Sequence, residues 1–202
     1  CDKRQPGTGY PARDGVNRIH AILGHSEHCI ATHPSDMCVA LAALEAVVEV
    51  EEPGGARRIP MADFHRLPGD APEHDTSLKA GEVITAVILP PDRFGANHTY
   101  LKLRDRLSYA FALVSVAVGL VMEGDAIAEA RIALGGVAHK PWRRAEAEAA
   151  MRGLGPDAAG ERAAEILLEG ARGFSHNEFK IELARRAIGR AIRQAAAGTP
   201  QH

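Results

Sequence analysis

The hydrophobic pattern of the chain changes character near Pro141, and this change constrains the fold more than any other feature. Before it, three stretches rich in β-branched and apolar residues follow one another, at 98–104, 111–122 and 126–138. The segment 123–126 between the last two is typical of a tight hairpin turn. After it, Ala-rich stretches separated by Gly or Pro have the character of helices. Strands followed by helices indicate an α+β fold and argue against alternating βαβ units.

A helix is predicted to begin at Pro34–Ser35–Asp36. The side chain of Ser35 or Asp36 can accept a hydrogen bond from the free amides of a first helical turn. Apolar residues then recur with helical spacing, at Met37, Leu41, Leu44 and Val48. We therefore expect a helix that buries this face.

The segments around this helix have a mixed character. Residues 1–18 are polar and rich in Gly and Pro, which predicts an irregular loop. Two short strands, 46–52 and 56–61, are predicted on either side of a Pro-Gly-Gly turn. The polar stretch 62–82 favours a loop with one short helix, and 83–90 alternates around β-branched residues like a strand.

Composition excludes several classes of function. The 202 residues carry a formal net charge of −2, so no overall basic field attracts nucleic acid or an anionic membrane. The longest apolar run, 109–122, is shorter than the roughly 18 residues of a membrane span. We therefore expect neither nucleic acid nor a membrane as a partner. The odd count of three cysteines does not predict a disulfide framework, and suits a reducing compartment or ligands of a metal or cluster.

The densest group of reactive residues is HCIATHPSDM, residues 28–37, and spacing alone leaves its role open. Zinc ligands are one interpretation, although the spacing matches no common zinc motif: His20, His25, His28, Cys29 and His33. Cys29 beside His28 has the residue types of a nucleophilic pair, but neighbours on an extended chain point to opposite sides. The helix start offers free amides and a positive dipole end, so an anion or nucleotide site and a plain helix cap are the remaining interpretations.

Three motifs taken together resemble a known family. They are IHAILG with the following CIATHPSDM, LRDRLSYAFALVSVA at 103–117, and ALGGVAHKPWR at 133–143. The sequence resembles the FAD-binding subunit of molybdenum-containing hydroxylases, the xanthine dehydrogenase and aldehyde oxidoreductase family, in the branch whose flavin subunit also carries an iron–sulfur cluster. The resemblance implies the second lobe of a two-lobed FAD-binding domain at 1–92, with a cysteine-containing loop at 1–30. It also implies a C-terminal domain at 97–200, with a three-stranded antiparallel sheet and a helical bundle.

The resemblance further implies that the first FAD-binding lobe is missing from this chain. The chain opens with Cys1 inside a polar loop, which favours an N-terminally truncated fragment. Such a fragment is expected to hold FAD less tightly than the complete two-lobed domain.

The resemblance assigns FAD contacts to both halves of the chain. The segment at the helix start would line the ribityl and pyrophosphate region, and Asp36 would bond to hydroxyls. An aliphatic residue would pack on the isoalloxazine, and two further residues would lie beside the ring. The residues implied are Thr32, His33, Ser35, Asp36, Ile84, Lys102 and Tyr109.

Cysteines that the family uses for a four-iron, four-sulfur cluster are only partly present. Cys1 and Cys29 match two of the four expected ligands, and Tyr10 stands where a third is expected. Cys38 lies inside the predicted helix, where the family usually has a small apolar residue. We therefore expect the fold to be kept and the cluster to be lost.

The function implied is electron relay. A flavin subunit of this kind would pass electrons from iron–sulfur clusters through FAD to a final acceptor, in a complex with a molybdenum-cofactor subunit and a 2Fe-2S subunit. The complex would oxidise an aldehyde or an N-heterocycle. The alternative is a non-catalytic assembly module of the same fold that binds no cofactor. No secretory signal is visible, so the expected location is the cytoplasm, or the periplasm through export with a partner subunit.

Overall fold

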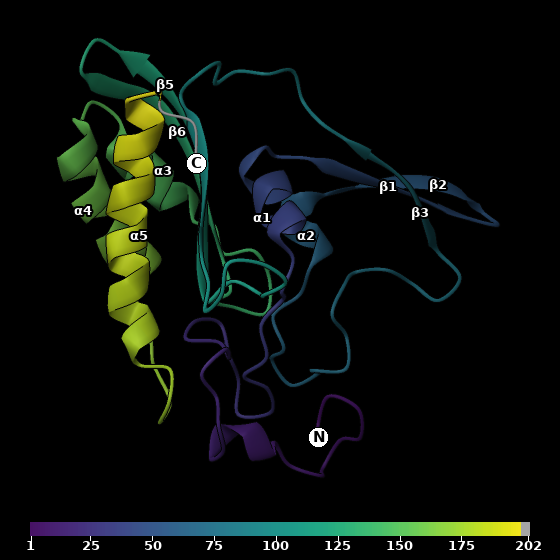
Figure 1. Cartoon of the computed structure of the whole chain (residues 1–202). Helices are drawn as coiled ribbons and strands as arrows, with labels where there is room; N and C mark the ends of the chain where they lie inside the picture. The colour runs from purple at the N-terminus through teal and green to yellow at the C-terminus, as the bar shows by residue number, and fades with distance from the viewer. Residues whose placement is uncertain (199–202) are drawn as a thin grey trace.

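Two separate three-stranded antiparallel sheets organise the chain (Figure 1), whose computed structural model describes residues 1–198. The first sheet has the order β2-β1-β3 and the second the order β4-β5-β6. Strand bounds are Val47–Glu52 (β1), Gly55–Pro60 (β2), Val83–Ile88 (β3), His98–Leu103 (β4), Val114–Glu123 (β5) and Ala126–Gly135 (β6). The predicted strands and both hairpins are confirmed. Residues 199–200 of the predicted C-terminal domain lie outside the described part.

The second sheet is covered on both faces. Helices α3 (Ala145–Met151), α4 (Pro156–Leu167) and α5 (Phe179–Ala196) pack on one face, and α1 (Asp36–Ala43) packs on the other (Figure 1). The central strand β5 is buried from Val114 to Leu120, so its continuous apolar run is explained by burial on both faces. The α+β class and the helical bundle after the strands are therefore confirmed. No helix within residues 1–198 combines the length and hydrophobicity of a bilayer span.

Helix α1 begins where the sequence predicts, but it buries a different face. The Ser35 side chain accepts a hydrogen bond from the Cys38 amide, as the predicted cap should. The buried residues are Val39, Ala42 and Ala43, whereas Met37 is 67% exposed. The predicted face of Met37, Leu41, Leu44 and Val48 is therefore wrong, because the helix ends at Ala43 and Val48 belongs to β1.

The physical reason is the close approach of α1 to the sheet. The helix lies on β5 and β6, and the small side chains Ala42 and Ala43 allow that contact. Glu45 then adopts a positive φ of 58°, which stops the helix and turns the chain into β1. Helical spacing alone cannot show that small residues pack against the sheet.

The first sheet has little cover on its β3 side. The short helix α2 (Met61–Phe64) is the predicted short helix of the loop region, and it packs near β1 and β2. By contrast, Val83, Ile84 and Val87 of β3 are 63%, 47% and 42% exposed. Strand β3 is thus an edge strand with apolar side chains in solvent.

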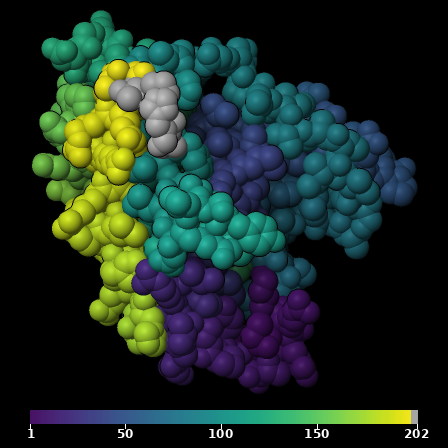
Figure 2. Space-filling view, viewed as in Figure 1, coloured from purple at the N-terminus to yellow at the C-terminus, as the bar shows by residue number. Residues whose placement is uncertain are grey.

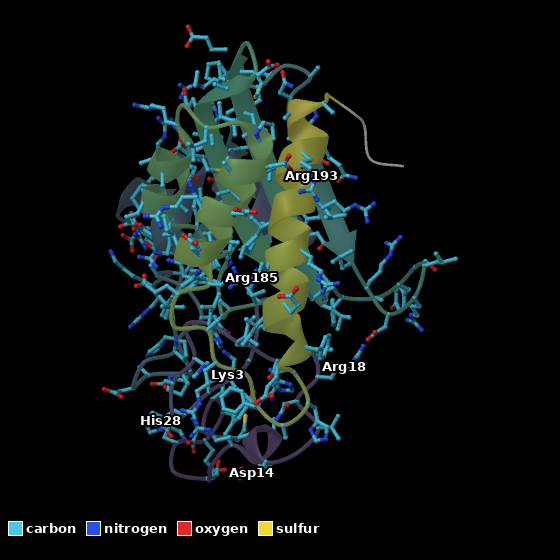
Figure 3. All side chains as sticks on the ribbon, turned by 90° about the vertical axis from the view of Figure 1, so that its left-hand side faces the viewer. Lys3, Asp14, Arg18, His28, Arg185 and Arg193 are labelled. Carbon is cyan, nitrogen blue, oxygen red and sulfur yellow. The ribbon has the colours of Figure 1, made fainter. Side chains whose placement is uncertain are left out.

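The N-terminal segment gathers at one end of the second sheet. Figure 3 shows Lys3, Asp14, Arg18 and His28 beyond the beginning of α5. Arg18 pairs with Asp105 at 2.7 Å, which joins this segment to the loop after β4. Figure 2 shows the same loop lying against the N-terminal residues. The segment is therefore packed against the second sheet although it has little regular secondary structure.

Lys180 of α5 anchors two loops from inside the core. Its side chain is fully buried, and its Nζ donates to the carbonyl oxygens of His20 at 2.7 Å and Gly136 at 2.6 Å. Burial lowers the pKa of Lys180 to about 7, because the charged ammonium loses its hydration. The unfolded chain keeps an ordinary lysine pKa of about 10.4.

This difference predicts a pH dependence of stability. Between pH about 7 and about 10 the unfolded chain binds a proton that the folded chain does not, so the free energy of unfolding should rise with pH. The slope from this group is at most about 1.4 kcal/mol per pH unit. Below pH about 7 both states are protonated and the contribution is constant. Urea denaturation of the wild type and of Lys180→Met between pH about 7 and about 10 measures this dependence. The free energy of unfolding should rise less steeply with pH in the variant, and equal slopes for the two proteins would contradict the prediction.

Candidate functional site

A small pocket lies where the N-terminal segment, the start of α1 and the end of the second sheet meet. Its volume is about 190 Å³. Backbone and polar side chains of residues 31–36 form one wall, and Gly135 and Gly136 at the end of β6 form another. The remaining lining includes Ile19, His20, Val39, Phe111, Ala112 and Ser115.

Asp36 is the acidic group at this pocket, and two side chains fix its carboxylate. Lys102 Nζ donates to one oxygen at 2.6 Å, and the Tyr100 hydroxyl donates to the other at 2.9 Å. The Ser115 hydroxyl lies 3.0 Å from the same phenol oxygen. Burial raises the pKa of Tyr100 and the Asp36 carboxylate adds to the rise, so the phenol stays protonated and remains a donor.

This arrangement orients Asp36 to accept further hydrogen bonds from a ligand. A carboxylate has about four acceptor positions, and the two protein donors use only part of them. A hydroxyl-rich ligand such as a sugar or a ribityl chain matches the remaining acceptors. The free amides at the start of α1 lie beside the same pocket and favour an anion.

Neither glycine of the opposite wall has room for a side chain, because other parts of the protein pack directly against its backbone. A Cβ on Gly135 would lie 2.3 Å from the Ser115 Oγ and 2.5 Å from a methyl carbon of Val39. A Cβ on Gly136 would lie 2.8 Å from the carbonyl oxygens of Ala112 and Leu113. Glycine is therefore required at both positions by the packing of the protein itself, and both residues also line the pocket.

The predicted FAD-contacting residues separate into two groups. Thr32, His33, Ser35 and Asp36 all line the pocket, and Lys102 reaches it through Asp36. The other two lie elsewhere: Ile84 is on β3 of the first sheet, and Tyr109 is 95% exposed in the loop before β5. Neither of these two side chains lines the pocket.

Sequence reasoning missed Tyr100 and Ser115. Tyr100 could have been inferred from the sequence, because it lies two positions before Lys102 in a predicted strand and therefore shares its face. Ser115 pairs with Lys102 in the register of β4 and β5, which the sequence does not specify. The Tyr100–Ser115 contact therefore could be found only from the structure.

The five proposed zinc ligands are not gathered into one site. His25 packs edge-on against Phe174 with ring centroids 5.0 Å apart, and His28 lies 3.5 Å from Asp2. The zinc interpretation of His20, His25, His28, Cys29 and His33 is therefore wrong, because each has a separate neighbourhood. Within residues 1–198, the one group of three metal-ligand types that converges is His33, Cys38 and His65.

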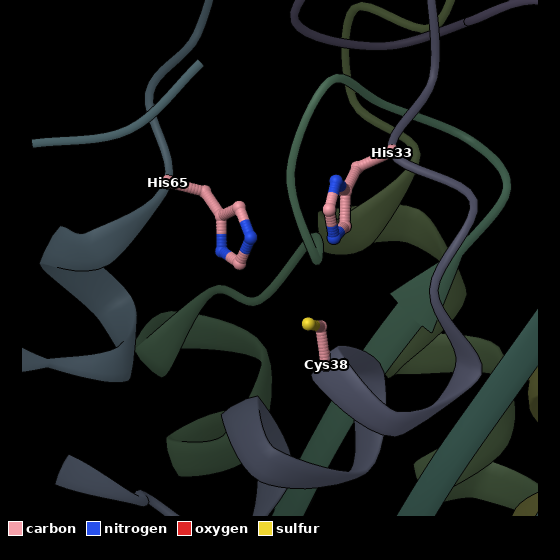
Figure 4. A group of neighbouring side chains, drawn as sticks. All are labelled: His33, Cys38 and His65. Carbon is pink, nitrogen blue, oxygen red and sulfur yellow. The ribbon is translucent and has the colours of Figure 1, made fainter. Parts of the chain in front are cut away.

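His33 and His65 lie close together in this group, with ring centroids 4.2 Å apart (Figure 4). Burial lowers the pKa of both imidazoles, and that of His65 falls to about 4 because the charges of His33 and Lys140 add to the effect. Both rings are thus neutral near pH 7. The sequence predicts Cys38 only as a helix residue, and nothing in its pattern singles out His65.

Cys29 has a different histidine partner from the one that adjacency suggests. Its Sγ lies 3.9 Å from His139 Nδ1, and His139 Nε2 lies 2.9 Å from Asp75. Asp75 also pairs with Lys3. The sulfur is completely buried, so the arrangement does not present a nucleophile to a substrate. The pairing of Cys29 with His28 is therefore wrong.

The cysteines of the chain do not supply an iron–sulfur cluster by themselves. Such a cluster takes four thiolates. Cys38 lies with His33 and His65, which leaves exposed Cys1 and buried Cys29. At Tyr10, burial and the neighbouring Cys29 raise the phenol pKa to about 12, so it stays neutral and is a poor ligand. The residues of this chain therefore do not fit the complete cluster.

Two family models match consecutive parts of the sequence. Residues 22–92 match the FAD binding domain in molybdopterin dehydrogenase, and residues 98–195 match the CO dehydrogenase flavoprotein C-terminal domain. The chain belongs to the family of FAD-binding medium subunits of molybdopterin-containing hydroxylases.

Particular relatives are similar to the chain over most of its length. The chain is 46% identical over 198 residues to the aldehyde oxidoreductase FAD-binding subunit PaoB of Escherichia coli K12, a match that covers 98% of this chain and 59% of PaoB. It is 27% identical over 168 residues to the carbon monoxide dehydrogenase medium chain of Afipia carboxidovorans, covering 81% of this chain and 56% of that one. The chain thus spans less than two thirds of the length of these relatives.

Solved structures agree with the fold. Reconstituted CO dehydrogenase from Oligotropha carboxidovorans superposes with a TM-score of 0.70 at 27% identity, over 81% of this chain and 57% of that one. Quinoline 2-oxidoreductase from Pseudomonas putida 86 gives a TM-score of 0.69 at 28% identity, over 91% and 60% of the two chains.

Proposed function

We propose that this chain binds part of an FAD molecule and serves as the flavin-carrying portion of a molybdenum hydroxylase of the aldehyde oxidoreductase type. The observation that carries the proposal is the pocket between α1 and β6, where Asp36 is fixed by Lys102 and Tyr100 opposite the Gly135–Gly136 backbone. When bound, FAD would accept electrons and pass them on.

The pocket suits a portion of FAD and not the whole molecule. Its volume of about 190 Å³ is below the roughly 300–1,000 Å³ of pockets that enclose complete ligands. Asp36 would accept hydrogen bonds from hydroxyls of the ribityl chain, and the amides at Ser35 and Asp36 would face the pyrophosphate. His20 also lines the pocket, and its buried Nδ1 has no hydrogen-bond partner within residues 1–198, so it offers a further polar atom to a ligand.

The flavin ring would lie outside this pocket. We assign Ile84, Lys102 and Tyr109 to its surroundings, as the family resemblance implies. Ile84 and Tyr109 are both exposed, so they are free to contact a ring held between this chain and another part of the protein. Under this proposal, residues 1–92 form the second FAD-binding lobe and 97–200 the C-terminal domain.

An isosteric variant of Asp36 tests the flavin site. In the intact protein, Asp36→Asn should weaken FAD binding about 10- to 100-fold, because a hydrogen bond to a charged group contributes about 1.5–3 kcal/mol. Two experiments measure FAD binding: the amount of FAD released when the purified protein is denatured, and a fluorescence titration of the flavin-free protein with FAD. Asp157→Asn is the matched control, since Asp157 also lies in a first helical turn but away from the pocket.

The partners and the electron path are part of the same proposal. We propose a complex with a molybdenum-cofactor subunit and a 2Fe-2S subunit, in the cytoplasm or exported with a partner. If the intact protein purified with those subunits shows no flavin absorbance and releases no FAD, the flavin function is wrong. An assembly module without cofactor is then the function that remains.

We also propose that no four-iron, four-sulfur cluster is completed in this protein. Tyr10 in place of a cysteine and the separate environment of Cys38 support this. Iron and acid-labile sulfide measured on the isolated flavin subunit should therefore be absent. Four iron atoms per subunit would overturn the proposal.

A further inference from the structure

Three potential metal ligands from two segments of the chain converge beside α1 and α2 (Figure 4). His33 precedes α1, Cys38 is in its first turn, and His65 directly follows α2. One nitrogen of each imidazole and the Cys38 sulfur all lie within 4.8 Å of one another. We propose that these three side chains bind a zinc-class transition-metal ion, with the fourth coordination position open to water.

Unpartnered buried nitrogens support this site. His33 Nε2 and His65 Nδ1 are both buried and have no hydrogen-bond partner among the described residues. Nearly all buried polar atoms in proteins are partnered, so two such atoms in contacting rings need an explanation. The His65 side chain is only 5% exposed. Figure 4 shows a ring nitrogen of His33 directed toward the Cys38 sulfur, where a metal ion would supply the missing partner.

The backbone of each ligand is already held in place. The His33 amide donates to the Ala138 carbonyl at 3.1 Å, and the Cys38 amide donates to the Ser35 hydroxyl at 3.2 Å. His65 forms a bridge with Thr76. Three fixed backbones reduce the conformational entropy that metal binding would otherwise cost.

The spacing requires only side-chain movement to close on a metal. Zinc binds sulfur at about 2.3 Å and imidazole nitrogen at about 2.0 Å, so the ligand atoms of a tetrahedral site with one sulfur and two nitrogens lie about 3.3–3.5 Å apart. Separations of up to 4.8 Å must therefore shorten by at most about 1.5 Å. His33 and Cys38 are both only half-buried as residues, so rotation of their side chains provides such a shift.

The donor set selects the kind of metal. One thiolate and two imidazoles suit zinc and other borderline or soft ions, whereas calcium and magnesium require oxygen ligands. Binding would displace the thiol proton, and neutral imidazoles can coordinate without losing one. The ion would tie the start of α1 to the end of α2, two segments that are otherwise far apart in the sequence.

Cobalt is the probe that tests this site, because a cobalt–thiolate bond absorbs in the near ultraviolet. Titration of Co²⁺ into the intact protein, recorded as difference spectra, should give this band with one equivalent per chain. Zn²⁺ should abolish it by displacement. Cys38→Ser should lose the band. His65→Gln should weaken Zn²⁺ binding at least about tenfold, because the loss of a residue that only hydrogen-bonds to a metal ligand already lowers metal affinity by about that factor.

Matched variants identify which cysteine and histidine are involved. Cys1→Ser removes an exposed thiol and His74→Gln an exposed imidazole, and both should leave the band and the affinity unchanged. Unchanged thermal unfolding without metal shows that each variant is folded. If the band is absent in the wild type, persists in Cys38→Ser or disappears in Cys1→Ser, the proposal is overturned. Neither Cys38 nor His65 lines the FAD pocket, so FAD content in the same samples reports separately on the proposed function.

Discussion

Replacing Glu148 by alanine is expected to lower the free energy of unfolding by about 3–5 kcal/mol, because it leaves buried polar groups without partners. Glu148 lies in α3 with only 8% of its side chain exposed. One carboxylate oxygen accepts from the Ile132 amide at 3.0 Å and from Arg143 Nε at 2.6 Å. The other accepts from a second Arg143 nitrogen at 2.8 Å.

The expected loss of stability is large because two hydrogen-bond donors lose their acceptor at the same time. The Ile132 amide in buried β6 would have no acceptor, and Arg143 would keep only Glu45 and the Ala42 carbonyl. Burial lowers the pKa of Arg143, but its two carboxylate partners outweigh burial and raise it, so the guanidinium stays charged throughout. Arg143 thus connects the end of α1 to α3, and Glu148 orients it.

Equilibrium denaturation in urea measures this effect, with two further variants for comparison. Glu148→Gln keeps an acceptor for Ile132 and should cost less than alanine. Glu146→Ala, in the same helical turn with a 70% exposed side chain, should change stability by no more than about 0.5 kcal/mol. Equal effects at Glu148 and Glu146 would show that the network contributes nothing.

The second large effect is expected at Gly136, where alanine should lower the free energy of unfolding by roughly 2–5 kcal/mol, the sum of two causes. A left-handed backbone with φ of 72° disfavours a side chain by about 1–2 kcal/mol, and overpacking costs about 1–3 kcal/mol. The added Cβ would clash with the carbonyl oxygens of Ala112 and Leu113, the two residues that precede β5. These are backbone atoms, so they cannot move aside as a flexible side chain could.

Gly153 separates these two causes. It has a similar φ of 77°, but a Cβ added there would have no atom of the described residues within 4 Å apart from its own chain neighbours. Gly153→Ala should therefore show only the backbone cost, and the difference between the variants measures the steric part. Gly136→Ala should also reduce FAD retention, since residue 136 lines the pocket. A Gly136 variant as stable as the Gly153 variant would contradict the close contact.

Much of the fold follows from local patterns that the sequence carries openly. The hairpin at Gly124 and Asp125, the Ser35 cap and the Gly- and Pro-separated helices are all decided within a few residues. The buried face of α1 does not follow from such a pattern, because Ala42 and Ala43 pack on the sheet and small residues give no strong periodic signal. Local sequence patterns therefore predict the helices and strands but not the contacts between them.

The candidate site shows the same division. The segment from Thr32 to Asp36 could be predicted because it is contiguous and its helix start has a recognisable cap. The side chains that contact these residues could not be predicted from the sequence. His65 reaches His33 only because α2 ends beside α1, and His139 reaches Cys29 across 110 positions. Contacts of this kind depend on the completed packing of both sheets.

The bare edge of β3 has a consequence for how this protein must be handled. A strand with unpaired backbone groups and exposed valine and isoleucine side chains can join any extended segment that meets it. The hydrophobic core does not cover these side chains, so the strand can pair with the same strand of another copy of the chain. The protein prepared by itself is therefore expected to self-associate through this strand well before it loses its internal structure.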